Sequence, residues 1–195
     1  MLFSKPKYEY IIVGLGNPGD KYANTRHNAG FRCLDLLIKE FNAGPEKSKF
    51  QSLIYEAEIK GHKVLFQKPQ TFMNNSGTAV SEVARFYKIP SDKIIVVADD
   101  VTIDAGRLRI RKSGSHGGHN GLRDIITLLG TDNIPRVKIG MGQKPHPEYD
   151  LADWVLSTPS KEDQEKTDDA EKRAAEAVKA MVTSDIGTAM NKFNR

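Results

Sequence analysis

The amino-acid sequence predicts an α/β protein: a single domain, residues 1–195, built on a twisted, mostly parallel and possibly mixed sheet flanked by helices. Segments with strand-like and helix-like apolar spacing interleave along the chain, which is the order that builds parallel sheets. A length of 195 residues suits one domain. No repeat and no low-complexity linker divides the sequence.

Each predicted element follows from its local apolar pattern. In the first half we expect a buried strand at 8–14 and a helix over 31–41 that ends at Gly44-Pro45. A hairpin of two strands, 53–60 and 62–68, is expected to turn at Gly61-His62, and a helix over 76–88 to end before Pro90. In the second half we expect strands at 94–98, 107–112 and 136–142, and a helix at 121–130. The tail is predicted to be a polar helix with an apolar stripe, followed by a short helix from about Ser184-Asp185.

Composition argues against a membrane or disulfide-bonded protein. Hydrophobic residues make up 38% of the chain, and the longest apolar runs, 11–13 and 94–98, are far shorter than the roughly 20 residues that span a bilayer. The N-terminal segment lacks the layout of a signal peptide. The one cysteine, Cys33, lies in a helical pattern and is interpreted as a packing residue. We therefore expect a cytoplasmic protein without membrane contacts.

Basic charge is concentrated outside one acidic segment. Residues 160–176 carry 4 basic and 7 acidic side chains, which leaves 25 basic and 18 acidic side chains for the rest of the chain. A basic body favours a polyanionic partner such as nucleic acid, although the same excess would also serve solubility.

Gly14, Gly16 and Gly19 form a G-x-G-x-x-G pattern directly after the first predicted strand. A dinucleotide site would need a helix opening at the third glycine and an acidic residue at the end of a second strand. Here a polar, turn-like segment follows Gly19, and the acidic residue at that spacing, Asp35, lies in a helical pattern. We interpret the glycines as a sharp turn that places Asn17 at the carboxyl edge of the sheet, where α/β proteins bind ligands.

A basic strand runs into a glycine-rich loop and a helix at 107–122. Alternation places Arg107, Arg109 and Arg111 on one face of the strand. The loop and the helix N-terminus can present backbone N–H groups to an anion beside them. A phosphate site is the favoured interpretation, and a solvated arginine face on an edge strand is the alternative.

Histidines stand at two places in this pattern. His116 and His119 have no third ligand nearby, so no metal is expected, and His119 with Asn120 is expected to hydrogen-bond a polar ligand. His27 follows the first strand, and residue chemistry alone leaves two interpretations: a general base, or a histidine in the first turn of a helix.

These segments together resemble bacterial peptidyl-tRNA hydrolases. The matching stretches keep their order over nearly the whole chain: 13–31 (VGLGNPGDKYANTRHNAGF), 67–77 (QKPQTFMNNSG), Asp99-Asp100, 114–125 (GSHGGHNGLRDI), 136–145 (RVKIGMGQKP) and 189–194 (AMNKFN). The resemblance implies hydrolysis of the ester between a peptide, or an N-blocked aminoacyl group, and the 3′-terminal ribose of tRNA. It also implies recycling of tRNA from the peptidyl-tRNA that ribosomes release.

The resemblance further implies roles for particular residues. His27 is the base that activates water, Asp100 is the carboxylate that orients it, and Asn17 contacts the peptide. The residues expected to meet the substrate, the 3′ CCA end or the acceptor stem are Tyr22, Phe72, Met73, Asn74, His119, Asn120, Arg111 and Lys138. No metal and no cofactor is expected, and the protein is expected to act as a monomer.

The residue types suit this chemistry. A histidine has a reference pKa near 6.5, and a carboxylate on its other ring nitrogen stabilises the imidazolium as it forms. An amide of Asn17, Asn74 or Asn120 is expected to stabilise the oxyanion. No Ser or Cys has a G-x-S-x-G context, so direct attack by water is favoured over a covalent intermediate.

Two other classes of function are alternatives. A non-catalytic RNA-binding protein on the same fold would be indicated by loss of His27 or Asp100, and both are present. A nucleotide-dependent oxidoreductase would carry or bind NAD.

Overall fold

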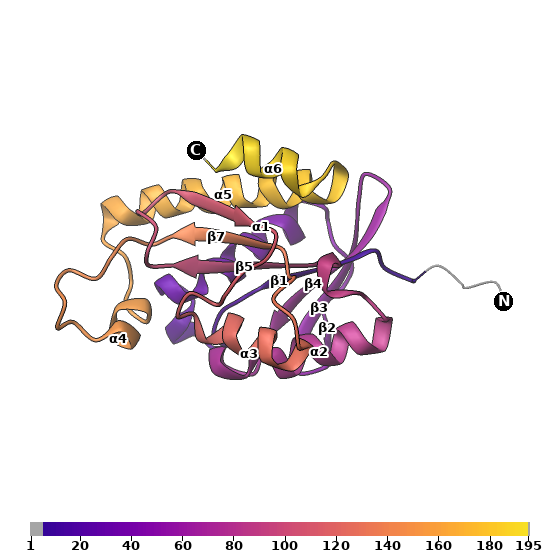
Figure 1. Ribbon diagram of the computed structural model, residues 1–195, viewed down its shortest axis with the longest axis horizontal. Helices are drawn as coiled ribbons and strands as arrows, with labels where there is room; N and C mark the ends of the chain where they lie inside the picture. The colour runs from indigo at the N-terminus through magenta and orange to yellow at the C-terminus, as the bar shows by residue number, and fades with distance from the viewer. Residues whose placement is uncertain (1–5, 195) are drawn as a thin grey trace.

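The structure is a computed structural model that describes residues 6–194, and it contains a seven-stranded sheet between two layers of helices (Figure 1). The strands lie in the order β2-β3-β4-β1-β5-β7-β6. Their bounds are Tyr10–Gly14 (β1), Lys47–Lys49 (β2), Ser52–Ile59 (β3), His62–Pro69 (β4), Ile94–Asp100 (β5), Leu108–Arg111 (β6) and Arg136–Gly140 (β7). β4, β1, β5 and β7 pair in parallel, whereas β2–β3, β3–β4 and β6–β7 are antiparallel pairs. The predicted α/β class, with a mixed sheet around a parallel core, is confirmed.

Helices cover both faces of the sheet. The helices α1 (Ala29–Glu40), α5 (Lys161–Thr183) and α6 (Ile186–Phe193) pack on one face, and α2 (Ser76–Tyr87) and α3 (Asn120–Leu129) pack on the other. Figure 1 shows α5 and α6 above the sheet, with α2 and α3 below it. The short helix α4 (Leu151–Val155) lies at one end of the molecule. The 3₁₀ turns are η1 (Asp20–Tyr22), η2 (Arg26–Asn28), η3 (Met73–Asn75) and η4 (Ser91–Lys93). In the described part of the chain, no helix combines the length and apolar character needed to cross a bilayer.

The predicted strands and helices are confirmed, with small shifts at their ends. The β3–β4 hairpin turns at Lys60 and Gly61, whose φ angles of 46° and 89° are both positive, as in the turns favoured for two-residue hairpins. His62 therefore already belongs to β4. The short elements β2 and α4 were not predicted, because three and five residues are too few to show a period. β5 extends two residues further than predicted and includes both Asp99 and Asp100.

The order of the strands determines where a site can form. From β1 the chain passes to β4 on one side and later to β5 on the other side, so the direction of the connections switches between β1 and β5. In open α/β sheets, ligands bind outside the carboxyl ends of strands at such a switch point. The loop after β1 and the end of β5 meet there, and α1 does not begin until Ala29, ten residues after Gly19. The helix that a dinucleotide site requires directly after the glycine pattern is therefore missing from this loop.

Two glycines let α1 lie against the sheet. A Cβ at Gly14 would come within 2.4 Å of the carbonyl oxygen of Gly30. A Cβ at Gly30 would come within 2.4 Å of both the Leu15 nitrogen and the Val97 oxygen. Since only a hydrogen fits at either position, the start of α1 and the η2 turn before it are held directly over β1 and β5.

We predict that Gly30→Ala separates α1 from the sheet. Overpacking a buried site typically costs about 1–3 kcal/mol, and the loss should reach the upper end here because the neighbours are backbone atoms. Urea unfolding followed by circular dichroism measures the free energy of unfolding. Gly44→Ala is the matched control, since a Cβ there meets only the Glu56 oxygen at 3.5 Å. Equal stability of Gly30→Ala and Gly44→Ala would contradict the close approach.

Candidate active site

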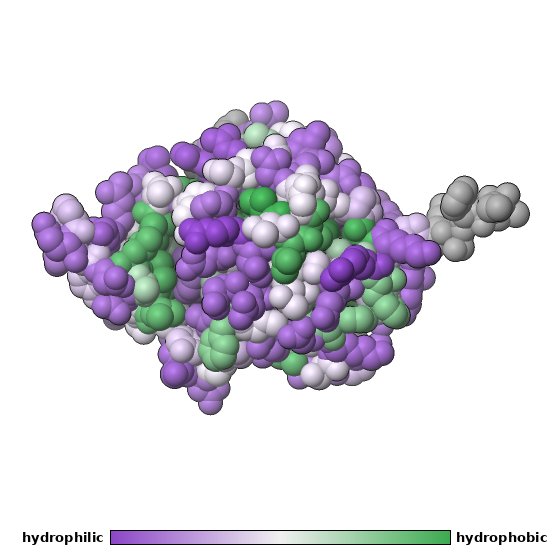
Figure 2. Space-filling view, turned by 60° about the horizontal axis from the view of Figure 1, so that its bottom comes forward, coloured by the Kyte–Doolittle hydropathy of each residue, from purple (hydrophilic) through white to green (hydrophobic). Residues whose placement is uncertain are grey.

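A cleft of about 680 Å³ opens at the carboxyl edge of the sheet. Residues from the loop after β1, η3, the end of β5, the start of α3, β7 and α4 line it. It brings together these sequence-predicted residues: Asn17, His27, Phe72, Met73, Asn74, Asp100, His119, Asn120 and Lys138. Tyr22 and Arg111 are not among the lining residues. In Figure 2 a band of apolar surface crosses the left of the view, the end at which Figure 1 places α4.

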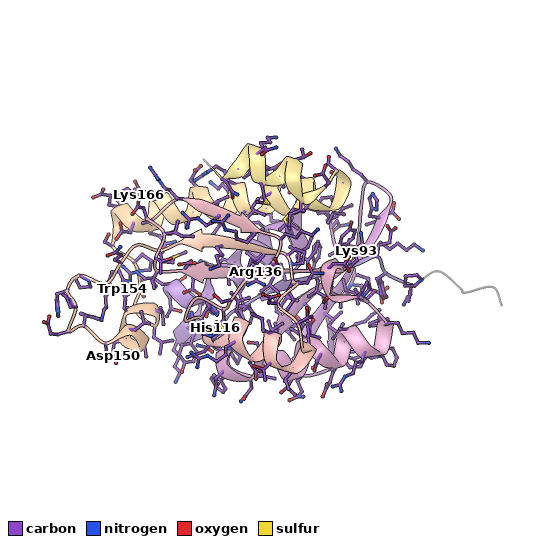
Figure 3. The ribbon with its side chains drawn as sticks, viewed as in Figure 1. Lys93, His116, Arg136, Asp150, Trp154 and Lys166 are labelled. Atoms are coloured by element: carbon purple, nitrogen blue, oxygen red, sulfur yellow. The ribbon has the colours of Figure 1, made fainter. Side chains whose placement is uncertain are left out.

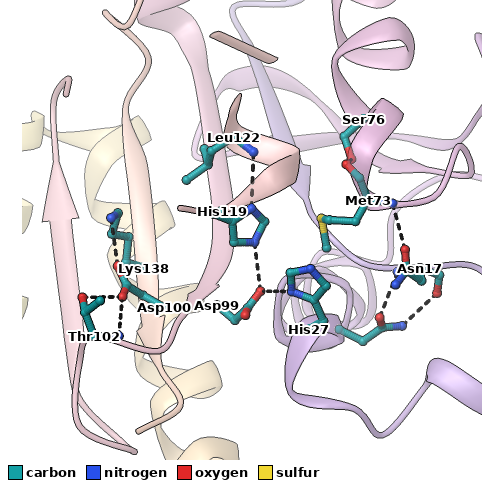
Figure 4. A network of polar contacts seen from close by, with 11 residues as sticks. Asn17, His27, Met73, Ser76, Asp99, Asp100, Thr102, His119, Leu122 and Lys138 are labelled. Carbon is teal, nitrogen blue, oxygen red and sulfur yellow. Dashed lines mark hydrogen bonds and ion pairs between the residues drawn. The ribbon is translucent and has the colours of Figure 1, made fainter. Parts of the chain in front are cut away.

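The centre of the cleft is a buried contact between His27 and Asp99 (Figure 4). Nδ1 of His27 lies 2.7 Å from Oδ1 of Asp99, and the two residues are only 8% and 3% exposed. Burial disfavours a charged imidazole, but the negative charge of Asp99 and its hydrogen bond outweigh burial and raise the pKa of His27 above its ordinary value. Because Nδ1 is engaged, Nε2 is the ring nitrogen left to accept a proton.

Asp100 does not contact His27, so the prediction that Asp100 orients this histidine is wrong. Oδ2 of Asp100 accepts from Nζ of Lys138 at 2.8 Å, and Oδ1 accepts from the backbone and hydroxyl of Thr102. Burial opposes the charge on Asp100, but these bonds outweigh it and lower the pKa of Asp100.

The alternation of side chains along β5 explains why Asp99, and not Asp100, contacts His27. Val97 belongs to the core beneath α1, and Asp99 continues that face of the strand. Ala98 belongs to the opposite core and pairs in register with Lys138, so Asp100 continues the face on which Lys138 lies. Both aspartates follow the same apolar run, and only the register of β5 distinguishes them.

His119 reaches the same carboxylate oxygen from the start of α3. Its Nε2 lies 3.0 Å from Oδ1 of Asp99, and its ring centroid lies 4.9 Å from that of His27. Its Nδ1 accepts the backbone N–H of Leu122 at 3.3 Å, so His119 also caps α3. Both ring nitrogens of His119 are engaged within the protein, whereas the sequence predicted that they would bond a ligand.

The group formed by His27, Asp99 and His119 has the composition of a metal site, and its ligand atoms lie within 4.8 Å of one another. Two imidazoles and a carboxylate are ligands that zinc accepts. A metal would need the lone pair of Nε2 in His119, but the bond from Leu122 to Nδ1 assigns the ring hydrogen to Nε2. The hydrogen-bond pattern therefore opposes coordination.

Asn17 is held by three hydrogen bonds. Its backbone N–H donates to Oδ1 of Asn28 at 2.9 Å, and Nδ2 of Asn28 donates to the Asn17 carbonyl at 3.0 Å. The side-chain oxygen of Asn17 accepts from the backbone of Met73 at 2.8 Å. Within residues 6–194 no hydrogen bond uses Nδ2 of Asn17, so its amide hydrogens can serve a ligand. Sequence reasoning missed Asn28, whose only signal was its place beside His27.

An aromatic pair borders the cleft. Phe72 is 52% exposed, and its ring centroid lies 6.2 Å from that of Tyr22 in an edge-on arrangement. Nζ of Lys21 lies 4.7 Å from the Tyr22 ring. Phe72 has a φ of 50°, in the left-handed region that bulky residues rarely adopt, and such strain concentrates at functional sites.

A buried arginine supports the glycine-rich loop (Figure 3). The guanidinium of Arg136 donates to the carbonyl oxygens of Gly114, Ser115, Asp132 and Ile134. The loop it holds leads to His119. His119 caps α3, so the N-terminus of this helix is partly satisfied, and within the loop the N–H groups of Gly114 and Gly118 donate to Asp132 and His116.

The helix α4 and the residue that follows it form an apolar wall of the cleft with these residues: Leu151, Ala152, Val155 and Leu156. Arg26, next to His27, joins this wall to the segment that carries His27. Its guanidinium lies 3.5 Å over the Trp154 ring and donates to the Ser157 hydroxyl at 2.6 Å. The side chain of Arg26 therefore fixes the apolar wall relative to the turn that carries His27.

The fold and the site define an α/β enzyme with a buried histidine–aspartate pair in a cleft at the carboxyl edge of its sheet. The chain belongs to the peptidyl-tRNA hydrolase family, whose model matches residues 11–195. The protein is thus a hydrolase that acts on peptidyl-tRNA.

Curated relatives and solved structures agree with this assignment. The chain is 49% identical over 185 residues to a peptidyl-tRNA hydrolase of Clostridium botulinum (strain Alaska E43 / Type E3), covering 95% of both chains. It is 46% identical over 185 residues to that of Lachnospira eligens, covering 95% of this chain and 99% of the relative. A crystal structure of peptidyl-tRNA hydrolase from Acinetobacter baumannii is similar with a TM-score of 0.90 and 36% identity, covering 98% and 97% of the two chains. A 5′-methylthioadenosine nucleosidase of Arabidopsis thaliana, with a TM-score of 0.56 and 10% identity, shares the fold alone.

We predict that Asp99→Asn and Asp100→Asn separate the roles of the two aspartates. Asp99 raises the pKa of His27, and a base works only when deprotonated, so activity should fall as pH drops through that pKa. Asp99→Asn should lower kcat by about 10²–10⁴-fold and move the acid limb to lower pH. Asp100→Asn, its neighbour on the other face, should leave the acid limb in place. Both pH–rate profiles are measured with N-blocked aminoacyl-tRNA, and an acid limb that moves with Asp100 would contradict the pairing.

Proposed function

We propose that the protein cleaves the ester between a peptide, or an N-blocked aminoacyl group, and the 3′-terminal ribose of tRNA, with His27 as general base and Asp99 as its partner. The observation that carries this proposal is the buried 2.7 Å contact between Nδ1 of His27 and Oδ1 of Asp99. It directs the free Nε2 of His27 to a cleft that also holds the Asn17 amide. This pair replaces the pairing with Asp100 that the sequence suggested.

The steps follow from this geometry. Nε2 of His27 takes a proton from water while the water oxygen bonds to the ester carbonyl carbon, which gives a tetrahedral oxyanion. Asp99 stabilises the imidazolium across Nδ1. When the intermediate collapses, the C–O bond to ribose breaks and the ribose oxygen takes the proton from Nε2. The products are a peptide with a free carboxyl group, which then loses its proton to the solvent, and a tRNA with a free 3′ hydroxyl.

Asn17 is the best candidate for stabilising the oxyanion or the adjacent peptide carbonyl. Its side-chain oxygen is bonded to the Met73 backbone, so only its N–H groups face a ligand, and an amide held in one orientation loses little freedom when the charge develops. Asn74 and Asn120 line the cleft and are exposed, which suits contacts with the ribose and bases of the 3′ end.

In this proposal the tRNA lies across the mouth of the cleft. The Phe72 and Tyr22 rings offer surfaces for unpaired bases of the CCA end, since stacking on aromatic side chains is a common way to bind single strands. Arg111 on the exposed edge strand β6 supplies positive charge for phosphates of the acceptor stem. Lys138 lines the cleft, where its ion pair with Asp100 leaves it a weaker phosphate contact than a free cation would be. Met73 is a wall of the groove.

Water, base and oxyanion donors suffice for an ester, so the proposed reaction uses neither metal nor cofactor. We assign it to the cytoplasm, where translation supplies peptidyl-tRNA, and its role is to return tRNA from abandoned peptidyl-tRNA. We propose that a monomer carries it out, because one chain contributes every residue in the scheme.

His27→Asn tests the base directly. The asparagine amide replaces the Nδ1 donor to Asp99 but offers no base, so hydrolysis should fall by about 10²–10⁴-fold with little change in tRNA affinity. Single-turnover cleavage of N-acetyl-aminoacyl-tRNA and binding of deacylated tRNA are the two measurements. His62→Ala is the control, because His62 pairs with Glu9 at the other end of β4. Activity within threefold of wild type in His27→Asn would remove His27 from the mechanism.

Arg111→Ala tests the phosphate contact. Loss of one contact should weaken tRNA binding and reduce the slope of log affinity against log salt by about 0.7–0.9. Filter binding over a salt series gives this slope. Lys192→Ala, an exposed cation on α6, serves as the control for net charge. An unchanged slope in Arg111→Ala would place the acceptor stem elsewhere.

A further inference from the structure

Two histidines donate to a single carboxylate oxygen. Nδ1 of His27 lies 2.7 Å and Nε2 of His119 lies 3.0 Å from Oδ1 of Asp99. Figure 4 shows both rings reaching this carboxylate, His27 from the loop after β1 and His119 from the start of α3. Within the part of the chain described here, no hydrogen bond reaches Oδ2 of Asp99.

The tautomer of His119 follows from its second nitrogen. The backbone N–H of Leu122 points at Nδ1 from 3.3 Å, so Nδ1 must accept and the hydrogen of the ring lies on Nε2. His119 can therefore donate to Asp99 but cannot take a proton from it at Nε2. Because both nitrogens are bonded within the protein, the ring is fixed in position and is not free to serve as a ligand contact in this arrangement.

We propose that His119 is a positioning residue that orients Asp99 and restrains the basicity of His27 through the oxygen the two histidines share. The inference rests on the proposed function of His27 as the base. It changes the role of His119 from a substrate contact to an internal hydrogen-bond donor.

The direction of the effect follows from electrostatics. The negative charge of Asp99 stabilises the imidazolium form of His27. A second N–H on the same oxygen offsets part of that charge, so the imidazolium gains less than Asp99 alone would provide. His27 is then neutral at a lower pH than it would otherwise be, and it releases its proton to the leaving ribose oxygen more readily.

Other charged groups near the cleft have partners of their own or lie at its margin. Asp100 of β5 and Lys138 of β7 form an ion pair at 2.8 Å. Arg26 of η2 binds the segment after α4 and lies 3.9 Å from Asp163 of α5. Arg123 of α3 lines the cleft and is exposed, and the residues of α4 that line it are apolar. Among residues 6–194, His119 is therefore the ionisable side chain from outside η2 and β5 that hydrogen-bonds to the His27–Asp99 pair.

The test compares His119→Leu with His119→Gln. Leucine removes the donor and keeps an apolar volume that excludes water, whereas the glutamine amide nitrogen can occupy the position of Nε2. NMR titration of ¹⁵N-labelled imidazole in the free enzyme should show the pKa of His27 rising by about half to one unit in His119→Leu and by much less in His119→Gln. The acid limb of kcat/KM should move by the same amount in the same direction.

Asn120→Ala is the matched comparison, because Asn120 also lines the cleft but forms no hydrogen bond with Asp99. It should raise KM without moving the titration of His27. If His119→Leu fails to fold, His119→Asn keeps a favoured N-cap residue while its shorter amide falls away from Asp99. It should show the same upward shift.

An unchanged or lower pKa of His27 in the folded His119 variants would overturn the proposal, as would a rise in KM with an unmoved acid limb. The titration reports on His27 whether or not His27 is the base. A wild-type rate in His27→Asn would therefore defeat the catalytic assignment alone, while an unmoved titration would defeat the coupling through Asp99.

Discussion

The geometry of the site depends on the hydrogen bonds that the buried carboxylate of Asp99 accepts. Asp99 is 3% exposed, and an ion at that depth persists only when hydrogen-bond donors replace the water it has lost. His27 and His119 supply two such donors to one oxygen. The bonds join the end of β5, the loop after β1 and the start of α3, so the carboxylate that contacts the proposed base also fixes three separate segments at one point.

The backbone brings these segments together. The switch of connections between β1 and β5 leaves an opening at their carboxyl ends. The close approach of Gly14 to Gly30 positions η2 over this opening. Arg136 holds the glycine-rich loop that leads to His119. Arg26 holds α4, which closes one side of the cleft. These contacts hold the segments around His27 in place, and a proposed general base requires such precise positioning.

The sequence could predict the sheet, its helices and the placement of Asn17 and His27, because buried strands and amphipathic helices have periods that a single chain displays. It gave the partner of His27 as Asp100 instead of Asp99, since both follow one apolar run and only the register of β5 decides which face each occupies. It did not show that His119 is bonded internally, because its partners come from β5 and from the turn it caps. The helix α4 was missed for a related reason, as five residues carry no readable period.

In the proposed reaction, the protonation state of His27 controls the rate. A direct test is to measure the pKa of His27 by NMR in the free wild-type enzyme and compare it with the acid limb of kcat/KM for ester cleavage. The structure predicts that the two values coincide and lie above the ordinary histidine value of about 6.5, because Asp99 stabilises the imidazolium. A rate that stays constant while His27 titrates would contradict the account.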